Sequence, residues 1–449
     1  MPPAPALHPD RADQRQRLLN WLGCWVLLPN LPFAPVTLMG GPPRYADILI
    51  AGVTGLVARR LPYAGRLAAF IAVMTYLVAS FISRMFNMSV TMLLRVAGLV
   101  LDMKPATSPE YVVGIGLLVL TLGGGAWLLR RRQDFTLAGP LMGAAAASLL
   151  LAGCDYQLSR DTMGAYGRLA PDDAPFTSAT SQTRLLELAD GKTHILVVIV
   201  EAMGRPTDPA LARAFERIWQ RPELASRYTI TSGATPFFGS TTAAELRELC
   251  QRWSNYYEIS GPQSGCLPAR LAQRGYQTAS FHAFTPQFFD RKRWYPQIGL
   301  HENRFGADLM AAGASYCPNV FPGACDRDVP GQIAAHITRA RQPQFVYWLT
   351  LNSHLPIVAN RELGTADCAA LGPAMDADFP MICRLFTIWD DTAAALAKAV
   401  TRPDFPPTHI LVVGDHMPPF THQKSRLKFD PAQVPWILLK ARPADQPAS

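Results

Sequence analysis

Charged residues are scarce in this chain: they make up 17% of its 449 residues, whereas hydrophobic residues make up 49%. This balance is poor in charge for a wholly soluble protein, and the length exceeds that of one ordinary domain. The chain also lacks a basic patch interleaved with aromatic residues, which argues against a nucleic-acid-binding surface. Its cysteines form no CxxC pair of the kind that holds structural zinc. The net charge of +8 arises partly from arginines that flank apolar runs, which is typical of membrane proteins.

Five apolar runs lie in the first third of the chain. They are residues 18–39, 46–58, 67–83, 111–129 and 135–154. A helix needs about 20 residues to cross the hydrocarbon core of a membrane, so the fourth and fifth runs fit best. The first run is interrupted by prolines, and the second is short. We predict an N-terminal α-helical membrane domain, residues 1–154, with five membrane-spanning helices.

The distribution of basic residues predicts the orientation of these helices. If the N-terminus lies in the cytoplasm, nine arginines fall on the cytoplasmic side and four basic residues on the outer side. This bias follows the positive-inside rule and places the rest of the chain in the periplasm of a bacterial inner membrane. Residues 88–103 form a further apolar stretch around Arg95. We interpret it as a helix lying on the outer leaflet, and the alternative, a sixth span, would reverse the orientation.

Cysteines are concentrated in the polar remainder of the chain, where six of the eight lie. An even number of scattered cysteines favours an oxidising compartment such as the periplasm. Many pairings are open to six cysteines, and free buried thiols are the alternative, but the spacing favours loops between nearest neighbours. The favoured pairs are Cys250–Cys266, Cys317–Cys325 and Cys368–Cys383.

Residues 191–449 alternate between strand-like and helix-like patterns, after a polar linker at 155–190. Residues 194–200 are a nearly continuous apolar run, typical of a strand buried on both faces. Similar short runs occur at 277–282, 345–351, 409–413 and 435–439, and helical patterns occur at 210–220, 267–274 and 388–400. This alternation predicts a C-terminal α/β domain with a mainly parallel sheet.

Polar residues follow the ends of the predicted strands. Glu201 follows the first strand, His282 ends the second, His354 comes soon after the third, and Asp415 and His416 follow the fourth. The carboxyl ends of parallel strands share one edge of the sheet, where ligands bind. Carboxylates and imidazoles supply the oxygen and nitrogen ligands that suit Zn²⁺ or Mn²⁺. We therefore predict a divalent-metal site at this edge.

A small, hydroxyl-rich stretch at residues 239–242 precedes a helical pattern. A threonine hydroxyl is a poor nucleophile at neutral pH, but coordination to a divalent cation makes it a useful one. We predict that Thr241 is both the nucleophile and the fourth ligand of the metal. The predicted ligands are Glu201, Thr241, Asp415 and His416.

The same stretch also has a purely structural interpretation. Ser or Thr before a helix is more often a helix cap than a nucleophile. Thr242 and Glu245 are spaced as a capping box, so we predict that Thr242 caps the helix and leaves Thr241 free for the metal. The amino end of the helix would then favour the negative charge of a phosphate beside Thr241.

Seven short motifs follow one another in the soluble part of the chain. They are Val198-Ile199-Val200-Glu201, Gly239-Ser240-Thr241-Thr242 with Glu245, Leu267-Pro268, Gly275-Tyr276 with His282, Phe289-Asp290-Arg291, His354-Leu355-Pro356 and Gly414-Asp415-His416. In this order they resemble the alkaline-phosphatase/sulfatase superfamily. More narrowly, with the predicted spans before them, they resemble the membrane-bound phosphoglycerol and phosphoethanolamine transferases, which include the lipoteichoic acid synthases.

The resemblance implies a reaction and roles for particular residues. It implies one bound divalent ion, Zn²⁺ or Mn²⁺, catalytic roles for Thr241 and His354, and substrate binding by His282, Arg291 and His354. It implies transfer of phosphoglycerol or phosphoethanolamine from a membrane phospholipid to an envelope glycan or lipid sugar through a phosphothreonine intermediate. No nucleic acid takes part.

Two departures from the superfamily pattern leave the donor and the acceptor open. Met417-Pro418-Pro419 follows the Asp-His pair, where many relatives have Gly-Glu. Ala243 stands where the Gly-x-Thr-Ser-Asp form has an acid. Neither departure changes the four predicted metal ligands.

Three other functions are compatible with the sequence. Residues 266–270 fit the Cys-x-Pro-x-Arg pattern that sulfatases convert to formylglycine, although they begin 65 residues after Glu201, whereas Thr241 lies 40 residues after it, nearer the usual gap. A periplasmic phosphodiesterase would use water as the acceptor. A non-catalytic sensor or envelope assembly factor would keep the fold without the metal.

Overall fold

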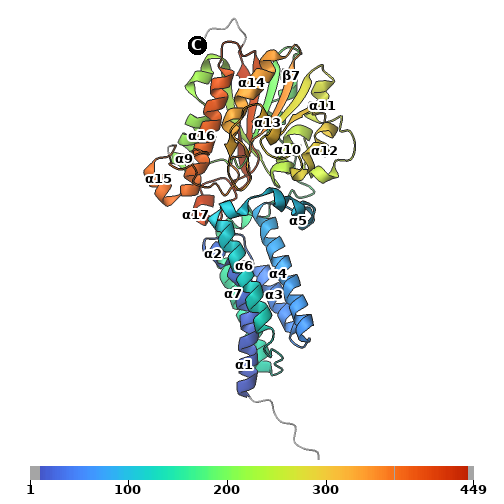
Figure 1. The fold of residues 1–449 in the computed structure, drawn as a ribbon, viewed down its shortest axis with the longest axis vertical. Coiled ribbons are helices and arrows are strands. Elements are labelled where there is room, and N and C mark those ends of the chain that lie inside the picture. Colours follow the sequence, from blue (N-terminus) through green and yellow to red (C-terminus); the bar gives the residue numbers. More distant parts are fainter. Residues whose placement is uncertain (1–10, 369, 443–449) are drawn as a thin grey trace, which may run out of the picture. The chain divides into compact units, whose positions relative to one another are not determined.

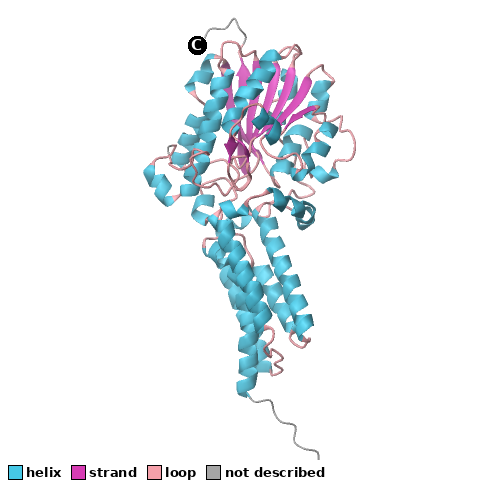
Figure 2. Cartoon of the chain, viewed as in Figure 1, coloured by secondary structure: helices cyan, strands magenta, loops and turns pink. Residues whose placement is uncertain are grey.

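The computed structural model describes residues 11–368 and 370–442, which form two compact units. Within the described residues, unit 1 comprises 11–85, Pro109–Tyr166 and Thr421–Gln423, and unit 2 comprises the rest. Figure 2 shows that unit 1 is helical and that the strands belong to unit 2. The outermost parts of the domains predicted from the sequence, residues 1–10 and 443–449, lie outside the described residues.

Unit 1 contains four helices that are long and apolar enough to cross a membrane. They are Arg11–Leu38, Tyr63–Met85 (α4), Pro109–Leu128 (α6) and Ala138–Ala165, the last of which comprises α7 (Ala138–Ser159) and a 3-10 turn. The second apolar run forms α3 (Tyr45–Ala58), whose 14 residues fall short of the about 20 that a span requires. The count of five spans therefore stays a prediction.

The first of these helices is not a uniform α-helix. It consists of α1 (Arg11–Leu22), a π-helical turn (Gly23–Leu27), a 3-10 stretch (Leu28–Phe33) and α2 (Ala34–Leu38). Proline lacks a backbone N–H and clashes with the preceding turn, so the prolines seen in the sequence account for the change of helix type.

Large aromatic side chains form the core of unit 1. Trp21, Trp25, Phe70 and Phe135 are fully buried there. The indole Nε1 of Trp25 donates to the side-chain oxygen of Gln133 at 3.0 Å, which satisfies both polar groups. Outward-facing apolar side chains cover α6 and α7, as expected of helices whose solvent is lipid.

Unit 2 is built on a seven-stranded sheet with the order β2-β9-β8-β1-β7-β3-β4. The strands are β1 (His194–Val200), β2 (Tyr228–Pro236), β3 (Gln277–His282), β4 (Glu302–Arg304), β7 (Gln344–Leu349), β8 (Thr408–Gly414) and β9 (Gln433–Ala441). The five strands from β8 to β4 are parallel, and β9 and β2 pair antiparallel at the other edge. A separate hairpin joins β5 (Tyr316–Cys317) and β6 (Gly323–Ala324).

The five strands predicted from apolar runs are confirmed as β1, β3, β7, β8 and β9. The structure adds two strands that the apolar runs do not predict, the short β4 at one edge of the sheet and, at the other edge, β2. Its residues are mostly polar or small, and most of them are exposed or half-buried, so no continuous apolar run marks the strand. β2 forms because its backbone pairs with β9 along nine residues.

Helices flank the sheet in two groups (Figure 1). α9 and α14 each pack against α16, whereas α10 packs against α8 and α11. The helices of unit 2 are α5 (Val90–Val96), α8 (Ala179–Gln182), α9 (Pro209–Trp219), α10 (Thr241–Cys250), α11 (Leu267–Ala272), α12 (Arg291–Trp294), α13 (Gly306–Ala311), α14 (Val329–Arg339), α15 (Pro373–Asp378), α16 (Pro380–Val400) and α17 (Gln423–Arg426).

Residues 86–108 belong to unit 2. The sequence predicts one interfacial helix here, but the structure has three short ones, α5 and the 3-10 helices Ala97–Asp102 and Pro105–Thr107. Contacts within unit 2 hold the segment: the Lys104 N–H donates to the Val320 carbonyl at 2.8 Å, and the Arg95 guanidinium lies 4.9 Å from the centre of the Tyr257 ring.

Three disulfides lie in unit 2. The structure pairs the cysteines as their spacing favours, and among the described residues only Cys24 and Cys154, both in unit 1, are free. The bridges are Cys250–Cys266, Cys317–Cys325 and Cys368–Cys383. Bridges closing loops of this size typically add about 2–4 kcal/mol each to stability.

Candidate metal and nucleophile site

The register of the parallel strands brings the predicted site residues to one edge of the sheet. Val200 pairs with Gly414, so the residues that follow, Glu201 and Asp415, leave neighbouring strands at the same level. Leu349 on β7 pairs with both Ile199 and His282, which places the end of β3 at this edge too.

Four predicted metal ligands meet at this edge. Ligand atoms of Glu201, Asp415 and His416 all lie within 4.8 Å of one another. The Thr241 hydroxyl donates to Glu201 Oε2 at 3.0 Å and lies 3.4 Å from His416 Nε2. All four side chains are buried.

The donor atoms at this site are free on the side that a cation would occupy. Among the described residues, Glu201 Oε1 and Asp415 Oδ2 are buried without a hydrogen-bond partner. Asp415 Oδ1, by contrast, accepts from the backbone N–H groups of Ala202 and His416 at 2.8 and 2.6 Å. Backbone bonds thus fix the carboxylate and leave its second oxygen for a ligand.

His416 is oriented in the way that metal-binding histidines usually are. Its Nδ1 lies 3.0 Å from the Met417 carbonyl, which assigns the proton to Nδ1. The lone pair of Nε2 then faces Asp415 Oδ2 at 3.2 Å and Glu201 Oε1 at 3.5 Å. Two carboxylates, one imidazole and one hydroxyl fit Zn²⁺ or Mn²⁺.

The electrostatics of the site also call for a cation. Burial raises the pKa of Glu201 well above its usual range, and the neighbouring Asp415 carboxylate raises it further. Two buried carboxylates repel each other unless a positive charge lies between them. A divalent ion would supply that charge and would make both anionic forms favourable.

Thr241 is the first residue of α10, and the turn before it determines where its hydroxyl lies. Gly239 has φ of +74°, a conformation that side chains other than glycine's rarely adopt. The cap position is occupied by Ser240, and Thr242 lies inside the first turn of the helix. The predicted capping role of Thr242 is therefore wrong: the cap lies two residues earlier, because the turn at Gly239 ends immediately before Ser240.

Glu245 does not close a capping box either. Its carboxylate turns away from the start of α10 and accepts from the hydroxyls of Tyr295 and Tyr347 and from the Arg291 guanidinium. The Arg291–Glu245 ion pair, at 2.9 Å, is buried. Although burial by itself lowers the pKa of Arg291, the Glu245 carboxylate raises it overall, so Arg291 is charged.

Arg291 follows a strained turn. Phe289 and Asp290 both have positive φ, +54° and +55°, which is costly for residues with side chains and is concentrated at functional sites. The turn directs Arg291 into the interior, where its charge is balanced by Glu245. Its predicted role in binding substrate phosphate stays a prediction.

His282 presents an acceptor nitrogen. Its Nδ1 lies 3.1 Å from the Leu349 carbonyl, and among the described residues its buried Nε2 has no partner. Burial, and then the charge of Arg291, lower the pKa of His282 well below its usual range. The imidazole is therefore neutral, with a lone pair on Nε2.

His354 lies beside the metal ligands, with its Nε2 4.0 Å from Glu201 Oε1. Its ring is 4.0 Å from the ring of Phe321 and 6.2 Å from that of Phe86, centre to centre. Burial, followed by the neighbouring His416 imidazole, lowers the pKa of His354 to about 3. Sequence reasoning missed both phenylalanines, and Phe86 follows directly after the third predicted span, where nothing marks it as part of a site.

The disulfide-closed hairpin that contains β5 and β6 supports the loop carrying His354. Asn319 Nδ2 donates to the His354 carbonyl at 3.4 Å. Asp326, next to Cys325, accepts from the backbone N–H groups of Leu351 and Asn352 at 2.8 and 2.6 Å. Burial raises the pKa of Asp326 to about 7, against the lowering effect of these two bonds. The sequence gives no signal for this support.

Arg247 is a second structural residue that the sequence did not single out. Its fully buried guanidinium donates to the carbonyls of Gly414 and Asp415 at 2.7 and 3.1 Å and pairs with Glu248 at 2.6 Å. The arginine thereby ties α10, which carries Thr241, to the end of β8, which carries Asp415 and His416.

The alternative nucleophile, Cys266, is bonded to Cys250 and directly precedes α11. No thiol is free there for conversion to formylglycine. The structure therefore leaves Thr241 as the nucleophile candidate next to the metal ligands.

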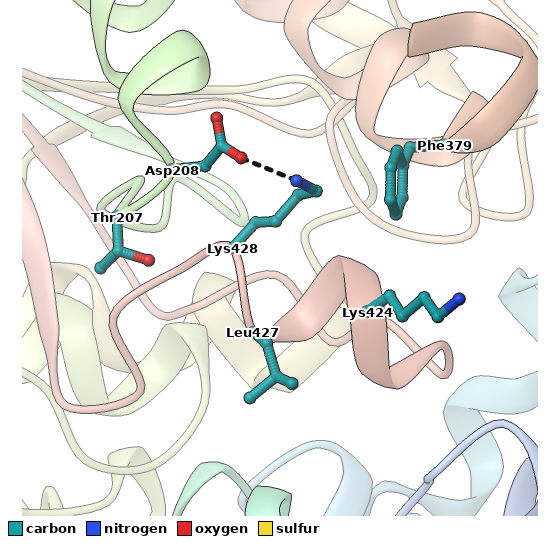
Figure 3. Close-up of a pocket in the computed structure, with 6 residues that line it drawn as sticks. All are labelled: Thr207, Asp208, Phe379, Lys424, Leu427 and Lys428. Carbon is teal, nitrogen blue, oxygen red and sulfur yellow. Dashed lines mark hydrogen bonds and ion pairs between the residues drawn. The ribbon is translucent and has the colours of Figure 1, made fainter.

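An open pocket of about 440 Å³ lies elsewhere in unit 2 (Figure 3). Inside it, Lys428 pairs with Asp208 at 2.7 Å, and the same ammonium lies 4.8 Å from the centre of the Phe379 ring. Its lining residues, none of which is a predicted site residue, are Thr207, Asp208, Phe379, Lys424, Leu427 and Lys428. We assign it no function.

Comparison with known proteins gives a family and several structural likenesses. A family model described as Sulfatase matches residues 193–439. The chain is similar in structure to the lipoteichoic acid synthase LtaP from Listeria monocytogenes, at 13% identity over 57% of this chain and 67% of that chain, with a TM-score of 0.43. It is also similar to the phosphoglycerol transferase GacH from Streptococcus pyogenes, at 15% identity over 60% of this chain and 78% of that chain, with a TM-score of 0.38. It is similar as well to the lipooligosaccharide phosphoethanolamine transferase A from Neisseria meningitidis, at 13% identity over 95% of this chain and 88% of that chain, with a TM-score of 0.47. No curated protein matches the chain in sequence.

Removing one ligand tests the metal site. We expect the purified full chain to bind Zn²⁺ or Mn²⁺, and Glu201→Gln to bind it at least about 100-fold more weakly, since even residues that only orient ligands are worth 10–100-fold. Metal content after dialysis against a graded chelator measures the affinity. Glu302→Gln, which changes an exposed carboxylate, is the matched control. Equal metal retention by the two variants contradicts the site.

The buried carboxyl of Asp326 predicts a pH dependence of stability. Its folded-state pKa of about 7 lies above the unfolded value of about 4, so folding favours the protonated form. The stability it contributes is complete below about pH 4 and is lost as the pH rises to about 7, by at most about 1.4 kcal/mol per pH unit. Asp326→Asn keeps an oxygen acceptor and lacks the titration.

Thermal unfolding midpoints of wild type and Asp326→Asn, measured between pH 5 and 8, test this. We expect the variant to gain stability relative to wild type as the pH rises, and the exposed control Asp378→Asn to show no such gain. A pH-independent difference between Asp326→Asn and wild type would refute the buried titration.

Proposed function

This chain belongs to the sulfatase family, and from that premise we propose that it is a transferase of phospho-alcohol head groups. The reaction moves phosphoglycerol or phosphoethanolamine from a membrane phospholipid to a hydroxyl of an envelope glycan or lipid sugar. The observation that carries the proposal is the position of the Thr241 hydroxyl, 3.0 Å from Glu201 Oε2 and 3.4 Å from His416 Nε2. A nucleophile in that position forms a covalent intermediate and permits transfer to an acceptor other than water.

The metal would be held by Glu201, Thr241, Asp415 and His416, as Zn²⁺ or Mn²⁺. When bound, it supplies positive charge that acidifies the threonine hydroxyl and neutralises a phosphoryl oxygen. The protein's part is to hold the hydroxyl against Glu201, and the Arg247 contacts keep α10 in register with the strand end.

In the first half-reaction, Thr241 Oγ1 attacks the phosphorus of the donor. A bond forms between Oγ1 and phosphorus, and the bond from phosphorus to the diacylglycerol oxygen breaks. The proton lost by the threonine ends on the diacylglycerol hydroxyl. A phosphothreonine diester carrying the head-group alcohol remains on the protein.

In the second half-reaction, the acceptor hydroxyl attacks the same phosphorus. The Oγ1–phosphorus bond breaks, and the acceptor's proton replaces the one that Thr241 lost. His354 would carry this proton on Nε2, since its Nδ1 lies 2.8 Å from the Leu355 carbonyl and its Nε2 faces Glu201. The negative charge of a bound phosphate would have to raise the pKa of His354 from about 3 for it to do so. Its half-buried ring lies near the rings of Phe321 and Phe86, which would limit the access of competing water.

The alcohol of the head group would meet His282. Its Nε2, which has no hydrogen-bond partner in the described part of the chain, is an acceptor, and both the hydroxyls of glycerol and the ammonium of ethanolamine are donors. The Phe289-Asp290-Arg291 element, which resembles that of the lipoteichoic acid synthases, favours phosphoglycerol. Arg291 would then contribute in two ways. Its ion pair with Glu245 would hold it in place, and its charge would help to keep His282 neutral by lowering the pKa of that imidazole.

The apolar helices and the disulfides support a location in the cell that suits this reaction. Helices long enough to cross a membrane keep the enzyme beside a lipid donor, and three disulfides suit an oxidising compartment. We propose an inner-membrane protein with its N-terminus in the cytoplasm and unit 2 in the periplasm.

Release of diacylglycerol tests the nucleophile. The full chain is placed in vesicles of labelled phosphatidylglycerol or phosphatidylethanolamine with Zn²⁺ or Mn²⁺. We expect Thr241→Ala to lower the rate of diacylglycerol release at least about 1000-fold, as loss of a covalent nucleophile does elsewhere. Thr242→Val, which removes the neighbouring hydroxyl at constant volume, is the control and should stay within a few-fold of wild type.

Two results count against the proposal. If Thr241→Ala keeps a tenth or more of wild-type activity, Thr241 is not the nucleophile. If wild type releases sulfate from a sulfate ester and no diacylglycerol from either lipid, the family's hydrolytic alternative holds.

A further inference from the structure

Four charged side chains lie together in the interior of unit 1. Arg44 directly precedes α3, Asp47 is in its first turn, Arg84 is in the last turn of α4, and Asp155 is near the end of α7. These helix ends adjoin Met85 and Tyr166, where the chain leaves unit 1 for unit 2. In a bundle that crosses a membrane, such helix ends lie at the level of the lipid head groups.

Three of the four charges have partners within the cluster. Asp47 accepts from the Ser80 hydroxyl at 3.1 Å and pairs with Arg84 at 3.2 Å. Asp155 accepts from the backbone N–H of Arg44 at 2.6 Å, so its negative charge interacts favourably with the amino end of α3.

The guanidinium of Arg44 is the exception. The residue is 2% exposed, and among the described residues its Nε and Nη2 are buried with no hydrogen-bond partner. No carboxylate of the described chain lies within 4.0 Å of it. Its guanidinium carbon stacks 3.7 Å from the centre of the Phe33 ring.

Asp47 and Asp155 lie near enough to balance the charge of Arg44, but neither carboxylate pairs with its guanidinium. Because buried N–H donors without an acceptor are costly, Nε and Nη2 call for an acceptor from outside the described chain. Nε and Nη2 are the two nitrogens along one edge of the guanidinium. That edge matches two oxygens of a phosphate, and stacking on an aromatic ring leaves it available. The position at the head-group end of the bundle supplies such a group.

We propose that Arg44, backed by Phe33, binds the phosphate of a membrane phospholipid. This site goes beyond the proposed function, because it uses no residue of the metal site and lies wholly within unit 1. It would retain one lipid on unit 1 whether or not Thr241 reacts with a donor lipid.

Native mass spectrometry of the full chain tests the site. The protein is extracted in detergent, stripped of bulk lipid and titrated with phosphatidylglycerol. We expect wild type to hold one lipid, and Arg44→Gln to hold it at least about tenfold more weakly, the loss typical of a charge-assisted bidentate bond. Lys424→Gln, which removes one cation outside the helical unit, should match wild type.

A second titration with inorganic phosphate distinguishes the source of the anion. If phosphate binds to wild type in an Arg44-dependent manner and phosphatidylglycerol does not, the site takes a free anion and the lipid assignment is overturned. Equal lipid binding by wild type and Arg44→Gln overturns the site altogether. If Arg44→Gln does not fold, Phe33→Leu replaces it and should weaken lipid binding several-fold.

Thr241→Ala separates this inference from the proposed function. It should keep the lipid bound to Arg44 even though diacylglycerol release is lost. Lipid retention that disappears in Thr241→Ala but persists in Arg44→Gln assigns the bound lipid to the metal site and contradicts the inference.

Discussion

The repulsion between two buried carboxylates, Glu201 and Asp415, is the constraint on which unit 2 depends. Among the described residues, each carboxylate has one buried oxygen without a hydrogen-bond partner. The chain supplies no lysine or arginine to either of those oxygens among its described residues. A divalent ion would resolve this conflict, and its charge would also make a threonine hydroxyl a usable nucleophile. The charges that make the metal-free site unfavourable are thus the ones that the proposed mechanism would use.

Much of the surrounding structure holds these atoms at a fixed geometry. The strand register puts Glu201 and Asp415 at one level. Gly414 permits the close approach of the two strand ends, because a Cβ there would collide with the Met203 carbonyl. Arg247 links the helix of Thr241 to the Asp415 strand, and Asp326 holds the loop of His354. These residues are not predicted ligands, yet the distances among the predicted metal ligands depend on them.

The sequence predicts the parallel half of the sheet and the meeting of its ligands because both depend on local patterns. Buried strands read as apolar runs, and ligands follow directly after them. Long-range pairing is less visible: β2 is polar and forms only against β9, and Phe86 reaches His354 from a segment next to an apolar run. The predicted capping box is wrong for the same reason: the Glu245 carboxylate accepts hydrogen bonds from Arg291 and from two tyrosines that lie far along the chain. Two buried arginines, Arg44 and Arg247, gave no signal because burial is not a property of the residue type.

The covalent intermediate is the claim on which the functional interpretation rests. Peptide mass spectrometry of the His354→Ala chain, incubated with metal and phosphatidylglycerol or phosphatidylethanolamine but no acceptor, measures it directly. The intermediate predicts a peptide containing Thr241 that carries the mass of the donor's phospho-alcohol, with fragmentation placing it on Thr241. Diacylglycerol release without any adduct, or an adduct on another residue, would contradict it.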